Sequence, residues 1–146
     1  MVALVVVVMG LLVWMVVKKP STTDTASDNN IISRNGLHYH PKLDIYIKGR
    51  PQTIPSGVGL GAAHQPIHTH DADHIIHLEM TGLVTVDNTR LGEFFRIWDK
   101  QFNSNCIFDF CNGASGTVKM FVNRQPNSDF EKYPMKNDDK IEIRYE

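Results

Sequence analysis

The sequence contains little cysteine and no excess of charge of either sign. Only two of its 146 residues are cysteines, and its 15 basic and 16 acidic residues leave a formal net charge of -1. The low cysteine count excludes a disulfide-dense scaffold. The scattered Lys and Arg residues argue against nucleic-acid binding, because neutralising a phosphate backbone requires a basic stripe. With 42% hydrophobic residues, the composition is that of one ordinary folded domain.

The one long apolar run lies at the N-terminus. Residues 1–17 read MVALVVVVMGLLVWMVV, without a charge or a proline. Seventeen helical residues span about 25 Å, at the short end of what crosses a bilayer. A cleaved signal peptide would need a basic segment before the run and a small-residue cleavage site after it, and neither is present. The run therefore predicts an uncleaved transmembrane anchor.

A polar segment follows this anchor. Residues 18–30 end in PSTTDTASDNN, which is small and polar without periodicity. Such a composition is typical of a flexible tether. We therefore expect a linker at 18–30 and a folded domain at 31–146.

Runs of alternating apolar residues predict short β-strands in the domain, because alternate side chains share one face of a strand. Four runs have this pattern: Leu43, Ile45 and Ile47; Ile76, Leu78 and Met80; Val118, Met120 and Val122; Ile141, Ile143 and Tyr145. A helix is predicted between the second and third runs, with N-cap chemistry at Asp87-Asn88-Thr89. Its apolar positions, spaced i, i+3, i+4, i+7 and i+11, are Leu91, Phe94, Phe95, Trp98 and Phe102. This stripe is expected to face the core.

The last 60 or so residues resemble the β-grasp arrangement of ubiquitin-like and sulfur-carrier domains. The resemblance rests on the order of the elements and on the pattern V-x-M-x-V-N…Y-x-M-K-N-D-D-K-I-E-I. The chain lacks the terminal Gly-Gly of sulfur carriers, so a carrier function is not implied. The expected fold is α+β and β-grasp-like, with mostly antiparallel strands and one amphipathic helix, preceded by one N-terminal transmembrane helix.

Histidine is confined to one part of the sequence. All seven histidines lie between His38 and His77, and histidine-rich tracts are typical of metal binding. Two H-x-H pairs, His38 with His40 and His68 with His70, each place two imidazoles on one face of a strand. If residues 71–74 form a hairpin turn, His68 lies opposite His77. Cross-strand Cβ atoms about 5 Å apart would let these imidazoles reach one ion.

The sequence thus predicts a cross-strand metal site, with hydrogen-bonded structural histidines as the alternative. The predicted ligands are His68, His70 and His77, with His38 and His40 as completing ligands or a second site. Glu79 and Asp71 are expected to orient the imidazoles by accepting their far N–H groups, or to be solvated surface. His64 lies in a glycine-rich loop and is expected to be exposed, whereas the role of His74 in the turn is left open.

Imidazole ligands favour Cu(II) or Zn(II), with Ni(II) or Fe(II) as the next candidates, and disfavour Mg and Ca. The methionines Met80, Met120 and Met135 fall at core-like or loop positions, so they are expected to be packing residues rather than Cu(I) ligands.

A second resemblance covers the histidine region. The pattern H-x-H-P-K-L-x-I-Y-I…P-I-H-T-H-D…H-x-E…L-G-E-F-F-R-I-W is similar to a group of small, membrane-anchored prokaryotic proteins without an established activity. The resemblance implies a family but no mechanism.

The two cysteines indicate on which side of the membrane the domain lies. Cys106 and Cys111 in CIFDFC match neither a zinc nor a redox C-x2-C motif, so we expect a disulfide outside the cytoplasm, with two buried thiols as the alternative. Lys18 and Lys19 directly after the anchor indicate the opposite orientation by the positive-inside rule. On balance a single-pass membrane protein with an extracytoplasmic domain is predicted.

Three functions remain open. The first is a membrane-tethered module that binds copper or zinc for capture, buffering or delivery, without a catalytic role. The second is a zinc-dependent hydrolase or lyase, in which three histidines leave one position for a water and Glu79 or Asp71 is the general base. The third is an interaction domain whose histidines sense pH. The first is preferred, because H-x-H pairs on two strands offer more ligands than catalysis needs; no protein partner is indicated.

Overall fold

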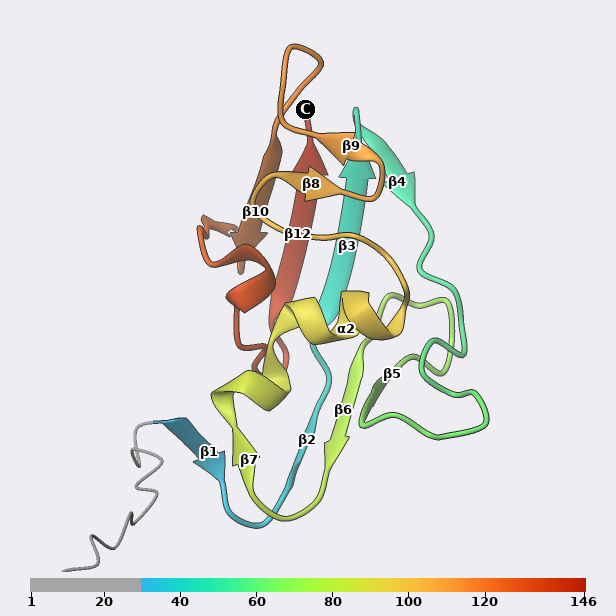
Figure 1. Ribbon diagram of the computed structural model, residues 1–146, viewed down its shortest axis with the longest axis vertical. Helices are drawn as coiled ribbons and strands as arrows, with labels where there is room; N and C mark the ends of the chain where they lie inside the picture. The colour runs from blue at the N-terminus through green and yellow to red at the C-terminus, as the bar shows by residue number, and fades with distance from the viewer. Residues whose placement is uncertain (1–29) are drawn as a thin grey trace, which may run out of the picture.

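The computed structural model describes residues 30–146, and these residues form a mostly β fold (Figure 1). Of these residues, 41% are in β-structure and 13% in helices. The strands are β1 (Ile31–Ser33), β2 (Leu37–Tyr39), β3 (Lys42–Ile47), β4 (Arg50–Gln52), β5 (Ile67–His68), β6 (His77–Met80), β7 (Val84–Thr85), β8 (Cys106–Ile107), β9 (Phe110–Cys111), β10 (Val118–Val122), β11 (Gln125–Pro126) and β12 (Lys140–Tyr145). The helices are the 3-10 helices η2 (Val86–Thr89) and η3 (Phe130–Lys132) and the α-helix α2 (Leu91–Ile97).

The largest sheet has five strands in the order β11-β10-β12-β3-β4. Its central pair, β12 and β3, is parallel, and the other pairs are antiparallel. The alternating runs predicted in β3, β10 and β12 all bury their apolar side chains. In Figure 1 helix α2 lies across the lower half of this sheet and the β8–β9 hairpin lies across its upper half. The core lies between the sheet and these two elements.

Helix α2 is shorter than the sequence predicts. The helix ends at Ile97, because Trp98 is its C-cap and Asp99 adopts a left-handed backbone with φ of 55°. The predicted N-cap residues instead form the separate 3-10 helix η2. Phe102, expected on the same helix, returns on the following loop and packs its ring 4.5 Å from that of Phe95. The aromatic side chains therefore pack in the core as expected, but they come from helix α2 and from the loop that follows it rather than from one helix.

The fold class predicted from the sequence is corrected by these observations. An α+β, β-grasp-like fold was expected, but the described chain is mostly β with a single seven-residue α-helix. Short strands that the sequence did not predict account for part of the difference, because β1 with β7 and β8 with β9 form two additional two-stranded sheets. Within residues 30–146, no helix is long and apolar enough to span a bilayer. The predicted anchor at 1–17 lies outside the described residues, as does the linker apart from Asn30.

The second sheet, with the order β2-β6-β5, lies beyond the lower end of the central sheet in Figure 1. Alternation carried back from Leu43, Ile45 and Ile47 places His38 and His40 on the opposite face of the same strand, which predicts one continuous strand from His38 to Ile47. That prediction is wrong, because β2 and β3 are separate strands. The strand breaks at His40 and Pro41, so that β2 pairs with β6 while β3 joins the central sheet. Proline lacks an N–H group, which makes it a natural break in a ladder of strand hydrogen bonds. The break moves His38 and His40 away from Asp44 and towards β6.

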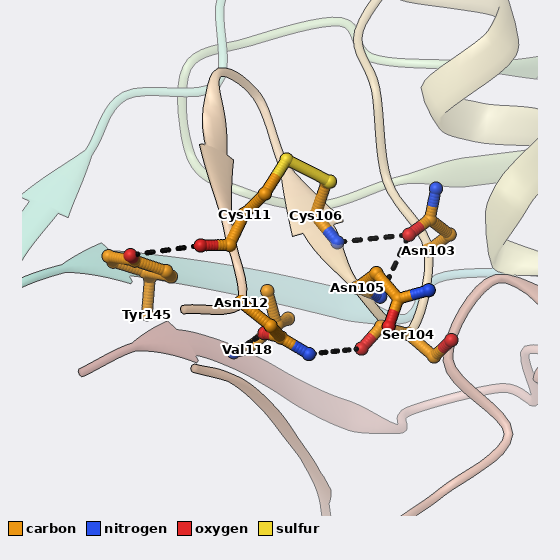
Figure 2. The surroundings of a disulfide bond; sticks show 8 residues. All are labelled: Asn103, Ser104, Asn105, Cys106, Cys111, Asn112, Val118 and Tyr145. Atoms are coloured by element: carbon orange, nitrogen blue, oxygen red, sulfur yellow. Dashed lines mark hydrogen bonds between the residues drawn. A yellow bond between two sulfur atoms is a disulfide. The ribbon is translucent and has the colours of Figure 1, made fainter. Parts of the chain in front are cut away.

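A disulfide between Cys106 and Cys111 closes the β8–β9 hairpin (Figure 2). The side-chain oxygen of Asn103 accepts hydrogen bonds from the backbone N–H groups of Asn105 and Cys106. The Tyr145 hydroxyl donates to the backbone oxygen of Cys111 at 3.1 Å, which ties the hairpin to β12. The β8–β9 hairpin lies at the opposite end of the central sheet from β5 and β6 in Figure 1, so the disulfide that closes it is remote from the histidine region.

Candidate metal centre

The pairing of β5 with β6 brings the first histidines together. His68 lies opposite His77 and Ile67 opposite Leu78, in the register that the sequence predicts. The backbone N–H of Glu79 donates to the Pro66 oxygen at 2.8 Å, which continues the ladder beyond the strand. Because Ile67, Ile76 and Leu78 are buried in the core, the alternate positions carry His77 and Glu79 on the other face.

Thr69, between His68 and His70, holds this segment in place. Its side chain is fully buried. Its hydroxyl donates to the Pro55 oxygen at 2.8 Å and accepts from the Val58 N–H at 3.1 Å. The neighbouring Gly59 has φ of 79°, and a Cβ there would lie 2.6 Å from the Ile67 oxygen, so only glycine permits this close approach. The loop therefore fixes the H-T-H segment through its middle residue.

A Thr69→Val variant is expected to be less stable than the wild type by about 1 to 3 kcal/mol. Valine has nearly the same shape, but it leaves the buried Val58 N–H and the Pro55 oxygen without that partner. Urea unfolding followed by circular dichroism measures the difference. An unchanged free energy of unfolding would show that Thr69 does not fix the loop.

The imidazole of His68 has a defined tautomer. The whole side chain is buried, and its Nδ1 lies 3.0 Å from the backbone oxygen of Gln65. A carbonyl oxygen can only accept, so Nδ1 carries the proton and Nε2 presents its lone pair. That Nε2 lies 3.1 Å from Nε2 of His70 and 3.9 Å from a carboxylate oxygen of Glu79. An N–H donated to a backbone carbonyl is the usual outer contact of a metal-binding histidine.

Strand β2 brings the other H-x-H pair to the same place. His38 lies opposite Glu79 across β2 and β6, and its Nε2 is 3.2 Å from the same Glu79 oxygen. The ring of His40 packs edge-on at 4.8 Å from that of His77. The backbone N–H of His40 donates to the Asn137 side chain at 2.8 Å, so the turn before β12 fixes the end of β2.

Six histidines and one glutamate thus form a continuous group, which we call the histidine cluster: His38, His40, His64, His68, His70, His77 and Glu79. Ring centroids 4.5 to 4.8 Å apart connect the imidazoles in the order 38, 40, 77, 70, 68, 64. Three subsets each have ligand atoms within 4.8 Å of one another. These subsets are His38, His40 and His77; His64, His68 and Glu79; and His70, His77 and Glu79.

The electrostatics of the cluster keep two of its rings neutral. Burial is the main cause that lowers the pKa of His68 below the usual value of 6.5, although the Gln65 carbonyl and the Glu79 carboxylate oppose the shift. Burial also lowers the pKa of His77, and the neighbouring rings of His70 and His40 add to that shift. Metals bind the neutral imidazole, so both side chains are in the form that binds an ion at neutral pH.

The metal-free protein is expected to lose stability as the pH falls below 6.5. The pKa of both His68 and His77 is lower in the folded than in the unfolded state, so below pH 6.5 the unfolded chain binds more protons. Their contribution is complete above pH 6.5 and is lost as the pH drops towards the folded pKa values. Urea midpoints at pH 7.5 and 5.5, measured with chelator present, test this expectation. An equal drop in a His68→Gln, His77→Gln double variant would contradict it.

The structure also places the three other residues considered in the sequence analysis, Asp71, His64 and His74. Asp71 is exposed and belongs to none of the three subsets, which agrees with its alternative interpretation as solvated surface. His64 is exposed as predicted, but its ring packs 4.5 Å from that of His68 and it joins the cluster. His74 lies outside the cluster and places Nδ1 2.7 Å from the carboxylate of Asp44. The remaining predicted ligands, His38, His40, His68, His70 and His77, are all brought together.

Two further features adjoin the cluster. Nδ1 of His77 is buried and has no hydrogen-bond partner within residues 30–146, which is unfavourable for a polar atom unless an ion or a water satisfies it. A cavity of about 570 Å³ opens beside Glu79, between β6 and helix α2, with Pro66, Asn88 and Arg96 in its wall. The cluster therefore has both an unsatisfied ligand atom and space next to its carboxylate.

Comparison with known proteins found no family model, no curated protein and no solved structure that matches the chain. The functional argument therefore rests on the side chains of the cluster.

Proposed function

We propose that this protein binds a transition-metal ion through the histidine cluster. The observation that carries the proposal is the arrangement of three subsets of three ligand atoms within 4.8 Å. It is supported by the Gln65 carbonyl that directs the lone pair of His68 into the cluster and by the partnerless Nδ1 of His77. A structural role alone does not explain why six imidazoles pack in one continuous chain of ring contacts.

The chemistry of the donors favours Cu(II) or Zn(II), because the cluster offers imidazole nitrogens and one carboxylate but no thiolate. We also propose that residues 1–17 tether the domain to a membrane, with the domain on the extracytoplasmic side. The support is the uninterrupted apolar run and, for the compartment, the disulfide between Cys106 and Cys111. Capture, buffering or delivery of the ion would suit such a module.

The proposal is tested by measuring bound metal. The full-length chain, purified without a polyhistidine tag and without chelator, is loaded with zinc or copper, desalted and subjected to elemental analysis. A variant with His38, His40, His64 and His70 changed to alanine leaves no complete subset of three but spares the buried His68. We expect metal in the wild type and in the control His74→Asn, and none in the fourfold variant. Equal metal content in all three proteins would refute the proposal.

A second candidate function is zinc-dependent hydrolysis, and the cavity beside Glu79 favours it. The subset of His38, His40 and His77 leaves a coordination position for water, and the carboxylate of Glu79, 3.2 Å from Nε2 of His38, can act as general base. Hydrolysis of activated esters by the zinc-loaded chain, lost in Glu79→Gln with zinc still bound, would support this function. Equal rates for the wild type and Glu79→Gln would refute a base role for Glu79.

A further inference from the structure

Two of the three subsets of the cluster can each bind an ion at the same time, whereas the third subset competes with both. The subset of His38, His40 and His77 shares no residue with the subset of His64, His68 and Glu79. The third subset, of His70, His77 and Glu79, takes one ligand from each of the other two. The cluster can therefore hold either one central ion on the third subset or two ions on the first two.

We propose, on the basis of the metal-binding function above, that the cluster binds two transition-metal ions at once: one on His38, His40 and His77, the other on His64, His68 and Glu79. This arrangement uses six of the seven side chains as ligands. A single central ion would use three and would leave His68 without a role, although the Gln65 carbonyl directs its Nε2 into the cluster.

Glu79 lies beside ligands of both proposed ions. One of its oxygens is 3.2 Å from Nε2 of His38, in the first subset, and 3.9 Å from Nε2 of His68, in the second. A carboxylate has two oxygens, so it can bind one ion and still contact the ligands of the other.

His70 belongs to neither of the two subsets proposed to bind the ions, and its position also favours two ions. Its Nε2 lies 3.1 Å from that of His68, and its ring packs 4.5 Å from that of His77. His70 thus contacts one ligand of each ion and is placed to complete the coordination of either. Tetrahedral zinc takes four ligands, so each subset of three has room for such a fourth donor or for water.

The two ions are expected to bind with different affinities. The subset with Glu79 carries the only carboxylate of the cluster, which attracts a divalent cation, so this subset fills first. The first ion then repels the second, for which His38, His40 and His77 offer only imidazole ligands. The isotherm for zinc should therefore show two unequal steps.

The test is a zinc titration of the full-length, tag-free chain by calorimetry, with the four single variants His40→Ala, His64→Ala, His70→Ala and His74→Asn. We expect two ions per wild-type chain and one ion per chain in both His40→Ala and His64→Ala, with the tighter step lost in His64→Ala. The control His74→Asn keeps two. Copper-loaded wild type and His74→Asn should also show a spin-coupled paramagnetic resonance spectrum, whereas His40→Ala and His64→Ala should each show that of an isolated Cu(II).

Other outcomes are distinguishable. One ion per chain, lost in His70→Ala and unaffected by His40→Ala and His64→Ala, would place a single ion on the third subset. That result would overturn the two-ion inference and leave the proposed function standing. A wild-type chain that binds no zinc and no copper would overturn both.

Discussion

A His68→Gln variant is expected to bind its first zinc ion at least about 100-fold more weakly than the wild type. Loss of an outer contact to a metal ligand commonly costs 10- to 100-fold in affinity, and loss of the ligand itself costs more. His68 is the most constrained ligand of the cluster, because its buried ring is fixed by the Gln65 carbonyl. Glutamine keeps much of the volume of the side chain. Competition with a chromophoric zinc chelator measures the affinity.

The matched control for this prediction is His74→Asn. His74 lies outside the cluster and has a left-handed backbone with φ of 70°, a conformation that asparagine tolerates. Its zinc affinity should equal that of the wild type. If both variants bind zinc as tightly as the wild type, His68 is not a ligand. A folded His68→Gln chain, verified by circular dichroism, excludes general unfolding as the cause of weak binding.

A Phe95→Ala variant is expected to lower the free energy of unfolding by about 3 to 5 kcal/mol, the usual cost of removing a buried phenylalanine ring. Phe95 is 1% exposed and lies at the centre of the aromatic core. Its ring packs against Phe102 at 4.5 Å, Phe94 at 5.8 Å and Trp98 at 5.9 Å. Because helix α2 contacts β5, the loss should also loosen the support of His68. Urea unfolding of the full-length chain measures the change in the free energy of unfolding.

Phe110→Ala is the control for the core prediction. Phe110 is 39% exposed, and its ring contacts Tyr145 at 5.3 Å. Phe110→Ala should lower the free energy of unfolding by at most about 1 kcal/mol, because a single exposed aromatic pair contributes little. Similar losses in Phe95→Ala and Phe110→Ala would show that the aromatic side chains under α2 do not form the main core.

Local sequence pattern predicted the parts of the fold that depend on periodicity. Alternation placed Leu43, Ile45 and Ile47 in the core, and helical spacing did the same for Phe94 and Phe95. The end of the helix and the break before Lys42 were missed. The first depends on a left-handed Asp99, and the second on β2 pairing with β6 rather than continuing into β3. Pairings between distant strands, including the parallel one of β12 and β3, leave no signature in a local pattern.

The candidate site was predictable where it depends on register. A turn at residues 71–74 places His68 opposite His77 by counting alone, because a strand has a period of two. His64 was missed as a cluster member because its position depends on a loop that folds back onto β5. That loop is fixed by contacts at Gly59 and Thr69, and the only sequence signal was the spacing of His64 four residues before His68. Asp71, like Glu79, is a carboxylate close to the histidines in the sequence. It differs from Glu79 in lying outside the paired residues of β5 and β6, where it is exposed.

The most direct test of a metal centre in the histidine cluster is zinc X-ray absorption on the loaded, desalted full-length chain. The account predicts a first shell at about 2.0 to 2.1 Å with the outer scattering of several imidazoles, and loss of that imidazole signal in the fourfold histidine variant. A first shell of oxygen alone, or the same spectrum in the wild type and the fourfold variant, would contradict it.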